Sequence, residues 1–257
     1  MAGLQEMITT TGEPAWTSSS PPLWFMALIA IGLHAVACSA AAFITWLYRA
    51  FLRPGKDLVR RYGAWAVVTG ATDGIGRAMA LELARQGLNL VLIGRNPAKL
   101  SRVGEEVQKA APSCKVTSLV FDLAGDTPDM CRGVARVAAA VEGLDVGILV
   151  NNAGATYTGP AYFHEVDTQV WETVVRMNVE ATTRITHAVV PATVRKRRGA
   201  IINMGSGSSA MLPAFPFYAL CSDAVYAASK AYIDKFSQSL STEYKQHEMD
   251  LQCQGTG

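Results

Sequence analysis

AWAVVTGATDGIGRAMALELARQGLNLVLIGR, residues 64–95, contains the pattern that decides the fold. A short apolar run (64–69) leads into a loop with three glycines (69–76). A segment with apolar residues at helical spacing follows (74–87), and a second apolar run comes after it (88–93). Apolar runs of this length indicate buried strands, and the segment between them fits one crossover helix. The stretch therefore predicts a strand–helix–strand unit with parallel strands.

The rest of the chain repeats this alternation of apolar runs and amphipathic segments. Further strands are expected at 115–121, 145–150, 200–205 and 249–254. Further helices are expected near 97–111, 129–142, 168–196 and 225–246. Continuous apolar strands between amphipathic helices indicate a parallel sheet that is covered on both faces. We therefore predict an α/β fold with a doubly wound, Rossmann-like parallel sheet.

The loop TGATDGIG (69–76) suits the phosphates of a dinucleotide. Its glycines permit a tight turn, close approach of the backbone to a pyrophosphate, and tight packing of helix on strand. The helix that follows would point its unpaired N–H groups at the phosphates. A strand before the loop and a helix after it are the context that this motif requires. The expected cofactor contacts in the loop are Gly70, Thr72, Asp73, Gly74, Ile75 and Gly76.

The second strand ends in Gly94-Arg95-Asn96 and not in an acidic residue. An acidic side chain at this point would bind the ribose hydroxyls of NAD, whereas a guanidinium favours the 2′-phosphate of NADP. The alternative is that Arg95 is an ordinary solvated surface residue. We expect NADPH to be the cofactor, with Arg95 and Asn96 in contact with it.

Residues 23–48 contain no Asp, Glu, Lys or Arg and are long enough to cross a bilayer as a helix. A cleaved signal peptide and a buried soluble helix are the alternatives; the late start and the absence of preceding basic residues argue against the first. Basic residues gather only after this segment, so the positive-inside rule places the C-terminal part in the cytosol. We expect a lumenal tail (1–22), a single transmembrane anchor (23–48), a basic linker (49–62) and one catalytic domain (63–257).

The composition argues against several classes of function. The net charge is +2, and no dense basic block is interleaved with aromatic residues, so nucleic acid is not an expected partner. The five cysteines are scattered and form no CxxC pair. This pattern argues against a disulfide framework and a zinc site, and we expect no metal.

Further motifs follow the glycine loop in one order along the chain. They are Asp122, NNAG (151–154), Asn178, Ser206, Tyr226 and Lys230. Together with the loop, this order resembles the short-chain dehydrogenase/reductase family, and the resemblance covers most of residues 63–253. It implies that Asp122 touches the adenine ring. It also implies that Asn151, Ala153 and Gly154 lie beside the cofactor.

The same resemblance makes Asn178, Ser206, Tyr226 and Lys230 a catalytic tetrad. Tyr226 and Lys230 are four residues apart, so they share one face of a helix, and an ammonium ion beside a phenol favours the phenolate form. Ser206 would polarise a substrate carbonyl, and Asn178 would hold a water that links Lys230 to solvent. Tyr226 would supply the proton, and the tyrosine and the lysine would also contact the cofactor. Taken singly, each residue also has an ordinary structural interpretation, such as an exposed helix pair or a turn serine.

The apolar segment, its basic flank, GLNLVLIGRNPAKL (87–100) and YAASKAYIDKFSQSL (226–240) are similar to the plant membrane-bound very-long-chain 3-oxoacyl-CoA reductases. This branch overlaps with 17β-hydroxysteroid dehydrogenases. The resemblance implies NADPH-dependent reduction of a long-chain 3-oxoacyl-CoA to the 3-hydroxyacyl-CoA in fatty-acid elongation, at the endoplasmic reticulum membrane. Other elongation enzymes and a second copy of this chain are the implied partners.

Two features depart from the family pattern. Ser206 and Tyr226 are 20 residues apart, which is more than the family's usual spacing. Removing LCSDA (220–224) from FPFYALCSDAVYAASK (215–230) leaves text that looks like the reductases, so we interpret these five residues as an insertion. Ser208 is then the alternative catalytic serine. The sequence also stops shortly after the last expected strand, so we expect a sheet domain that is truncated at its C-terminus.

Two other functions stay open on the sequence. The substrate could be a steroid or another lipid ketone. The segment that covers the substrate in the family, after the last strand expected here, is missing from this sequence, and that segment would select the substrate. The chain could also be a non-catalytic pseudo-enzyme that docks with elongation proteins, which the insertion and the truncation favour.

Overall fold

The computed structural model describes residues 22–52, 57–157, 159, 162–211 and 224–255. The chain divides into two compact units, Met1–Gly55 and Lys56–Gly257. In the first unit, α1 (Leu23–Leu47) continues into a π-helical turn (Tyr48–Leu52), and none of the α1 residues is buried. Within the described residues, α1 is the one helix long and apolar enough to cross a membrane, judged by length and composition.

The second unit contains a six-stranded sheet in which every neighbouring pair of strands is parallel. The strands are β1 (Trp65–Thr69), β2 (Asn89–Gly94), β3 (Val116–Val120), β4 (Val146–Asn151), β5 (Gly199–Met204) and β6 (Met249–Gln254). Their order in the sheet is β3-β2-β1-β4-β5-β6, which confirms the predicted doubly wound sheet. The order reverses between β1 and β4, and ligands bind in such sheets outside the carboxyl ends of the strands at this point.

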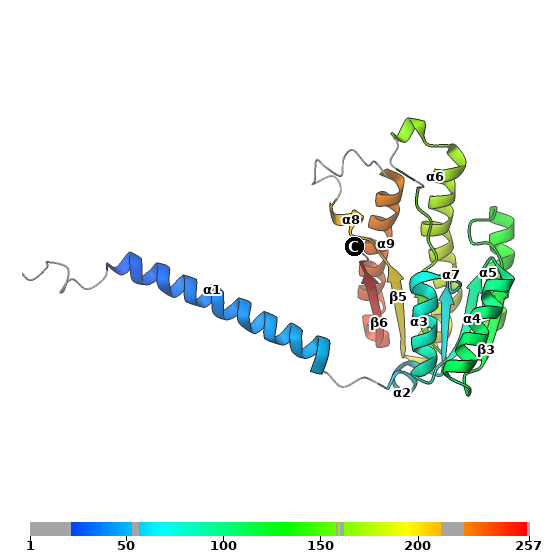
Figure 1. The fold of residues 1–257 in the computed structure, drawn as a ribbon, viewed down its shortest axis with the longest axis horizontal. Helices are drawn as coiled ribbons and strands as arrows, with labels where there is room; N and C mark the ends of the chain where they lie inside the picture. Colours follow the sequence, from blue (N-terminus) through cyan, green and yellow to red (C-terminus); the bar gives the residue numbers. More distant parts are fainter. Residues whose placement is uncertain (1–21, 53–56, 158, 160–161, 212–223, 256–257) are drawn as a thin grey trace, which may run out of the picture. The chain divides into compact units, whose positions relative to one another are not determined.

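Helices cover both faces of the sheet (Figure 1). They are α2 (Leu58–Tyr62), α3 (Gly74–Arg85), α4 (Pro97–Ala110), α5 (Thr127–Val141), α6 (Thr168–Val174), α7 (Thr182–Lys196), α8 (Ser208–Met211) and α9 (Ala224–Glu243). Because strand side chains alternate between faces, Ala66 and Val68 pack on the side of α3 and α4, whereas Val67 packs on the side of α5 and α7. Two short 3₁₀ turns complete the described part, at Phe163–Glu165 and Lys245–His247.

The single helix predicted at 168–196 is a run of three helical segments. A π-helical stretch, Val175–Ala181, joins α6 to α7. Apolar spacing indicates a helix but does not distinguish the i→i+5 hydrogen bonds of a π-helix from the i→i+4 bonds of an α-helix. The sequence pattern therefore could not predict the π-helical stretch. π-Helical turns occur frequently at functional sites, and this one contains Asn178.

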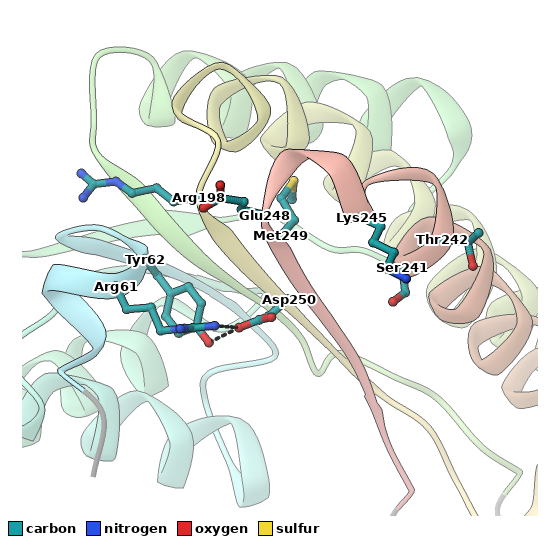
Figure 2. A pocket seen from close by; sticks show the side chains of 9 residues that line it. All are labelled: Arg61, Tyr62, Arg198, Ser241, Thr242, Lys245, Glu248, Met249 and Asp250. Carbon is teal, nitrogen blue, oxygen red and sulfur yellow. Dashed lines mark hydrogen bonds and ion pairs between the residues drawn. The ribbon is translucent and has the colours of Figure 1, made fainter. Parts of the chain in front are cut away.

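The short helix α2 is fastened to the last strand, β6. Arg61 Nη2 and Tyr62 Oη both donate to Asp250 Oδ2, at 2.7 and 2.5 Å (Figure 2). These residues line a hollow of about 670 Å³ together with Arg198, Lys245 and other residues of the same region. Asp250 is the second residue of β6, so this hollow lies at the amino ends of the strands. The residues predicted to bind the cofactor and to act in catalysis lie at the opposite, carboxyl edge.

Candidate active site

The glycine loop between β1 and α3 is held by close backbone packing. Gly70 has φ +62°, and a Cβ at this residue would lie 2.9 Å from the Ala153 Cα and the Asn152 Nδ2. A Cβ at Gly76 would lie 2.3 Å from the Gly70 carbonyl oxygen and 2.4 Å from the Asn152 Nδ2. These distances are shorter than any real Cβ contact, so both positions require glycine. Gly74 has φ +51°, but a Cβ at this residue would meet no atom within 4 Å, so its surroundings are open for a ligand.

The start of α3 carries a negative cap. Asp73 accepts a hydrogen bond from Gly74 N at 2.9 Å, and Lys99 Nζ lies 3.1 Å from its other carboxylate oxygen. The Gly74 N–H, followed by the Lys99 ammonium, holds the pKa of Asp73 below its ordinary value. Ile75 is exposed beside this cap. The cap fixes where the helix begins, and hence where its free N–H groups point.

Residues at the ends of β1, β2, β3 and β4 enclose a hollow of about 230 Å³. It is lined by Gly70, Thr72, Gly94, Arg95, Phe121, Asp122, Leu123, Asn152, Ala153, Gly154 and Met177. Six of the predicted cofactor residues line this hollow, namely Gly70, Thr72, Arg95, Asp122, Ala153 and Gly154. The other predicted loop residues, Asp73, Gly74, Ile75 and Gly76, do not line it. The hollow lies at the switch point of the sheet, where a dinucleotide is expected.

Arg95 is the basic residue that lines this hollow, and its guanidinium group suits an anion. The Arg95 side chain is exposed and forms no ion pair with any residue that the structure describes. Asp122 also lines the hollow, and its carboxylate accepts from the backbone N–H of Ala124 at 2.9 Å. Asn96 is used differently, because its side chain caps α4 by accepting from Lys99 N at 3.0 Å.

The two asparagines of NNAG have different surroundings. Asn151 is buried, and its Nδ2 donates to Thr186 Oγ1 and Asn203 Oδ1, both at 2.8 Å. It does not line the hollow. Asn152, which was not among the cofactor residues predicted from the sequence, lines the hollow, and its Nδ2 donates to the carbonyl oxygens of Thr69 and Gly70. Its position next to Asn151 in the motif was the available signal.

Asn178 is 2% exposed, and its side-chain amide joins two segments. Its Oδ1 accepts from Ala155 N at 2.8 Å, and its Nδ2 donates to Ala155 O at 3.0 Å. The same Nδ2 donates to Ser229 Oγ at 2.9 Å. The π-helical stretch is thereby bonded both to the segment after NNAG and to α9.

Lys230 and Tyr226 lie on α9 as predicted. The Lys230 Nζ donates to Met204 O at 2.8 Å and lies 5.7 Å from the centre of the Tyr226 ring. Lys230 is 8% exposed, and this burial lowers the pKa of its ammonium group from the ordinary value. A Cβ on Gly154 would lie 3.3 Å from Asn178 Oδ1 and 3.7 Å from Lys230 Nζ. Both side chains therefore converge on the glycine that lines the cofactor hollow.

Ser206 follows the end of β5, two residues after Met204. Its Oγ accepts from Ser208 Oγ at 3.0 Å and from Ser208 N at 3.3 Å. No described residue accepts the Ser206 hydroxyl proton in a hydrogen bond, so this proton is available to a substrate oxygen. The alternative serine, Ser208, instead donates its own proton to Ser206. The segment 220–224, interpreted as an insertion, lies outside the described residues apart from Ala224.

The arrangement provides the parts for ketone reduction. A glycine loop and an unpaired guanidinium suit a phosphorylated dinucleotide, and Ser206 can donate to a carbonyl oxygen. Tyr226 carries a hydroxyl group that can donate a proton, and the ammonium group of Lys230 lies 5.7 Å from the centre of its ring. Within the described residues, no group of His, Cys, Asp and Glu could hold a metal ion.

Known proteins match this chain over most of its length. The family model for short chain dehydrogenases matches residues 64–257. A very-long-chain 3-oxoacyl-CoA reductase-like protein of Arabidopsis thaliana is 42% identical over 243 residues, which cover 94% of this chain and 74% of that protein. The very-long-chain 3-oxoacyl-CoA reductase of Mycosarcoma maydis is 34% identical over 238 residues, which cover 89% of this chain and 65% of that protein.

Other matches differ in name. The inactive hydroxysteroid dehydrogenase-like protein 1 of Rattus norvegicus is 40% identical over 192 residues, which cover 73% of this chain and 53% of that protein. The chain thus spans between about half and three quarters of the length of these relatives. Among solved structures, a short-chain dehydrogenase from Sphingobium yanoikuyae in complex with NADPH is 30% identical, with a TM-score of 0.64. The match covers 74% of this chain and 68% of that chain.

The matched region includes the glycine loop, the hollow and all four residues of the predicted tetrad. The resemblance stated from the motifs is therefore confirmed, and this chain belongs to the short-chain dehydrogenase family.

Proposed function

We propose that this chain is an NADPH-dependent reductase that converts a very-long-chain 3-oxoacyl-CoA to the 3-hydroxyacyl-CoA in fatty-acid elongation. The observation that carries the proposal is the convergence of Asn178 and Lys230 on Gly154, beside the cofactor hollow. This convergence supports a proton-transfer role for both side chains beside the switch point of the sheet. The names of the Arabidopsis and Mycosarcoma relatives support the substrate class.

The residues present fit NADPH. The Gly70–Gly76 cradle would be filled by any side chain, and the start of α3 offers free N–H groups next to open space at Gly74. Arg95 would bind the 2′-phosphate, and Asp122 would contact the adenine ring. The solved relative in complex with NADPH supports this choice of cofactor. When bound, NADPH supplies the hydride for the 3-oxo carbon.

Three side chains of the tetrad divide the remaining work. Ser206 donates its free hydroxyl proton to the substrate carbonyl oxygen and polarises it, since its own lone pairs are engaged by Ser208. Tyr226 donates the proton that converts this oxygen to a hydroxyl. Lys230 stabilises the phenolate that Tyr226 leaves, because its ammonium lies 5.7 Å from the ring centre in a buried site.

Asn178 would help to return a proton to Tyr226 after each reduction, by holding a water molecule. One acceptor position of its Oδ1 is taken by Ala155 N, which leaves the second for a water beside Lys230. Such a water would connect the buried ammonium to solvent. The buried position of Asn178 and its three hydrogen bonds keep this acceptor fixed.

The proposed location is the endoplasmic reticulum membrane, with α1 as a single-pass anchor and the catalytic domain in the cytosol. Apolar length and composition support α1 as a span, and Arg49, Arg53, Lys56, Arg60 and Arg61 after it support the orientation. Other elongation enzymes are proposed partners. A homodimer through α6, α7 and α9 is also proposed, and the partly exposed Tyr232 on α9 offers apolar surface for it.

A second candidate is a non-catalytic protein anchored in the same membrane. It is favoured by the 40% identity to a rat protein that is named as inactive. A third candidate keeps the chemistry but takes a steroid or another lipid ketone as substrate, which the hydroxysteroid dehydrogenase-like name of the same relative favours.

The test uses the full chain in detergent, with NADPH consumption measured on 3-oxostearoyl-CoA and on estrone. Wild-type protein is expected to reduce the thioester. Tyr226→Phe is expected to lower kcat by about 100- to 10,000-fold and to leave NADPH affinity within about threefold. Tyr232→Phe is the matched control on the same helix, and it should retain activity. Among the described residues, the Tyr232 hydroxyl bonds to Thr183 alone, at 2.9 Å.

Each other result identifies a different candidate. Turnover of estrone alone would exclude the acyl-CoA substrate. NADPH binding without turnover on either ketone would favour the non-catalytic protein. Full turnover by Tyr226→Phe would contradict the assigned proton donor.

A further inference from the structure

Ser229 occupies the joint between the π-helical stretch and the catalytic helix. It is 3% exposed and lies between Tyr226 and Lys230 in the sequence. Its Oγ accepts from Asn178 Nδ2 at 2.9 Å and donates to Tyr226 O at 2.7 Å. One hydroxyl group therefore links the side chain of one tetrad residue to the backbone of another.

The Asn178 amide depends on this link for its orientation. Asn178 Nδ2 has two protons, and it donates one to Ala155 O and the other to Ser229 Oγ. Without the serine oxygen, one buried N–H would lose its partner, and the amide would gain freedom to turn. The acceptor position of Oδ1 that faces Gly154 and Lys230 would turn with it.

The bond to Tyr226 O acts on the other tetrad residues. It ties the peptide group of Tyr226 to the same serine that holds Asn178. Lys230, the next residue, donates to Met204 O at the end of β5. The first turn after Tyr226 is thus fixed at two points, one on the π-helical stretch and one on the sheet.

We propose, on the basis of the function proposed above, that Ser229 is a positioning residue for the reduction. Its hydroxyl fixes the position of Asn178 relative to Tyr226. The Asn178 oxygen that would hold a water and the Tyr226 proton donor then face the same side of the site. Ser229 acts through these neighbours and touches neither substrate nor cofactor. A displacement of about 1 Å in reacting groups can cost 100-fold in rate, so even a small loss of register has a measurable effect.

Two turns further along α9, Ser237 offers a matched control. It is 4% exposed, accepts from Asn203 Nδ2 at 2.8 Å and donates to Ile233 O at 2.7 Å. Both serines therefore accept from an asparagine amide and donate to a carbonyl of the preceding turn. The partners of Ser237 lie outside the tetrad, so its loss should affect stability alone.

The experiment compares Ser229→Ala and Ser237→Ala in the full chain. It measures Tm, NADPH affinity, and kcat and KM for 3-oxostearoyl-CoA. Both variants should lower Tm by similar amounts, because each leaves one buried amide proton without a partner. Only Ser229→Ala should lower kcat, by about 10- to 100-fold, with KM and NADPH affinity within about threefold.

Ser229→Thr retains the hydroxyl that bonds to Asn178 and Tyr226, so its kcat should exceed that of Ser229→Ala, although the added methyl group at this buried position lowers Tm. It also serves if the alanine variant does not fold. Equal kcat values for the two alanine variants, or a loss in Ser229→Thr as large as in Ser229→Ala, would overturn the positioning role. Failure of wild-type protein to reduce any ketone would instead overturn the proposed function, and the role of Ser229 with it.

Discussion

In the glycine loop (69–76), the residues that shape the site are neighbours in sequence, whereas the proposed catalytic cluster (Asn178, Ser206, Tyr226 and Lys230) comes from distant segments. Gly70, Asp73 and Gly76 set the turn, cap the helix and permit close packing within one short stretch. Asn178 and Ser229 are 51 residues apart, and Lys230 is 26 residues from its acceptor, Met204. The loop is therefore fixed by backbone geometry, and the cluster by buried hydrogen bonds.

This difference determines how each region should fail. A side chain added in the loop would clash with backbone atoms that cannot move away, so both the stability of the fold and the affinity for the cofactor should fall. A side chain changed in the cluster breaks one long-range bond, and turnover should fall while the sheet survives. Substitutions in the two regions can separate these kinds of failure, and the loop should show the largest effect.

Gly76→Val should abolish NADPH binding and destabilise the domain by about 3 kcal/mol or more. The reason is that a Cβ at this position would lie 2.3 Å from the Gly70 carbonyl oxygen. Thermal unfolding and NADPH fluorescence titration of the full chain measure both effects. Gly74→Ala is the control: its Cβ meets nothing within 4 Å, so it should cost only about 1–2 kcal/mol for the left-handed φ. Equal losses of stability in the two variants would contradict the steric argument.

Lys230→Met should reduce turnover by at least about 100-fold and yet stabilise the fold. Burial lowers the pKa of Lys230 below its ordinary value of 10.5. At neutral pH the folded state therefore contains a buried ammonium group, which makes the folded state less stable. The wild-type protein should gain stability as the pH rises from the lowered pKa toward 10.5, because the unfolded chain then binds more protons than the folded one. The Lys230→Met protein has no ionisable group at this position, so its stability lacks this pH dependence.

The stabilisation by Lys230→Met should therefore be largest near neutral pH and shrink on the alkaline side. Thermal unfolding of both proteins across this range tests the sign. Lys235→Met, on the exposed side of the same helix, is the control and should leave turnover unchanged. An advantage of methionine that grows with pH would show that burial of the ammonium is not the cause.

The same contrast explains how much could be predicted from the sequence. The strands, the sheet type and the glycine loop follow from local apolar spacing and glycine placement, and the structure confirms them. The helix predicted at 168–196 differs, because it contains the π-helical stretch Val175–Ala181. Asn152 and Ser229 were missed, because their roles depend on contacts with Gly70 and Asn178 that no local pattern reveals. For the same reason, Asn151 and Asn152 could not be told apart until their partners were known.

Arg95→Glu should weaken NADPH binding by about 10- to 100-fold and affect NADH much less, because a charge-assisted bond to the 2′-phosphate is lost. Arg95 is exposed and forms no ion pair with any residue in the described part of the chain, so Tm should not change. Titration with both nucleotides measures the ratio of NADPH affinity to NADH affinity. Lys109→Glu makes the same charge change on the exposed side of α4 and should leave the ratio as it is. An equal shift in both variants would point to net charge and not to contact.

Lys99→Met should have the smallest effect, and it tests the boundary between the two regions, because Lys99 is the long-range partner of a local cap. The Gly74 N–H, followed by Lys99, lowers the pKa of Asp73 below its ordinary value of 3.8. Stabilisation from this depressed pKa is present above 3.8 and is lost as the pH falls through the lower, folded value. Lys99→Met should therefore lower Tm slightly at pH 7, by an amount that disappears in acid, while NADPH affinity changes by less than about threefold. Asp73→Ala removes the bond to Gly74 as well and should lower Tm further. If Lys99→Met lowered Tm as much as Asp73→Ala, the loop would depend on its distant ion pair more than on its own backbone, and the contrast with the catalytic cluster would fail.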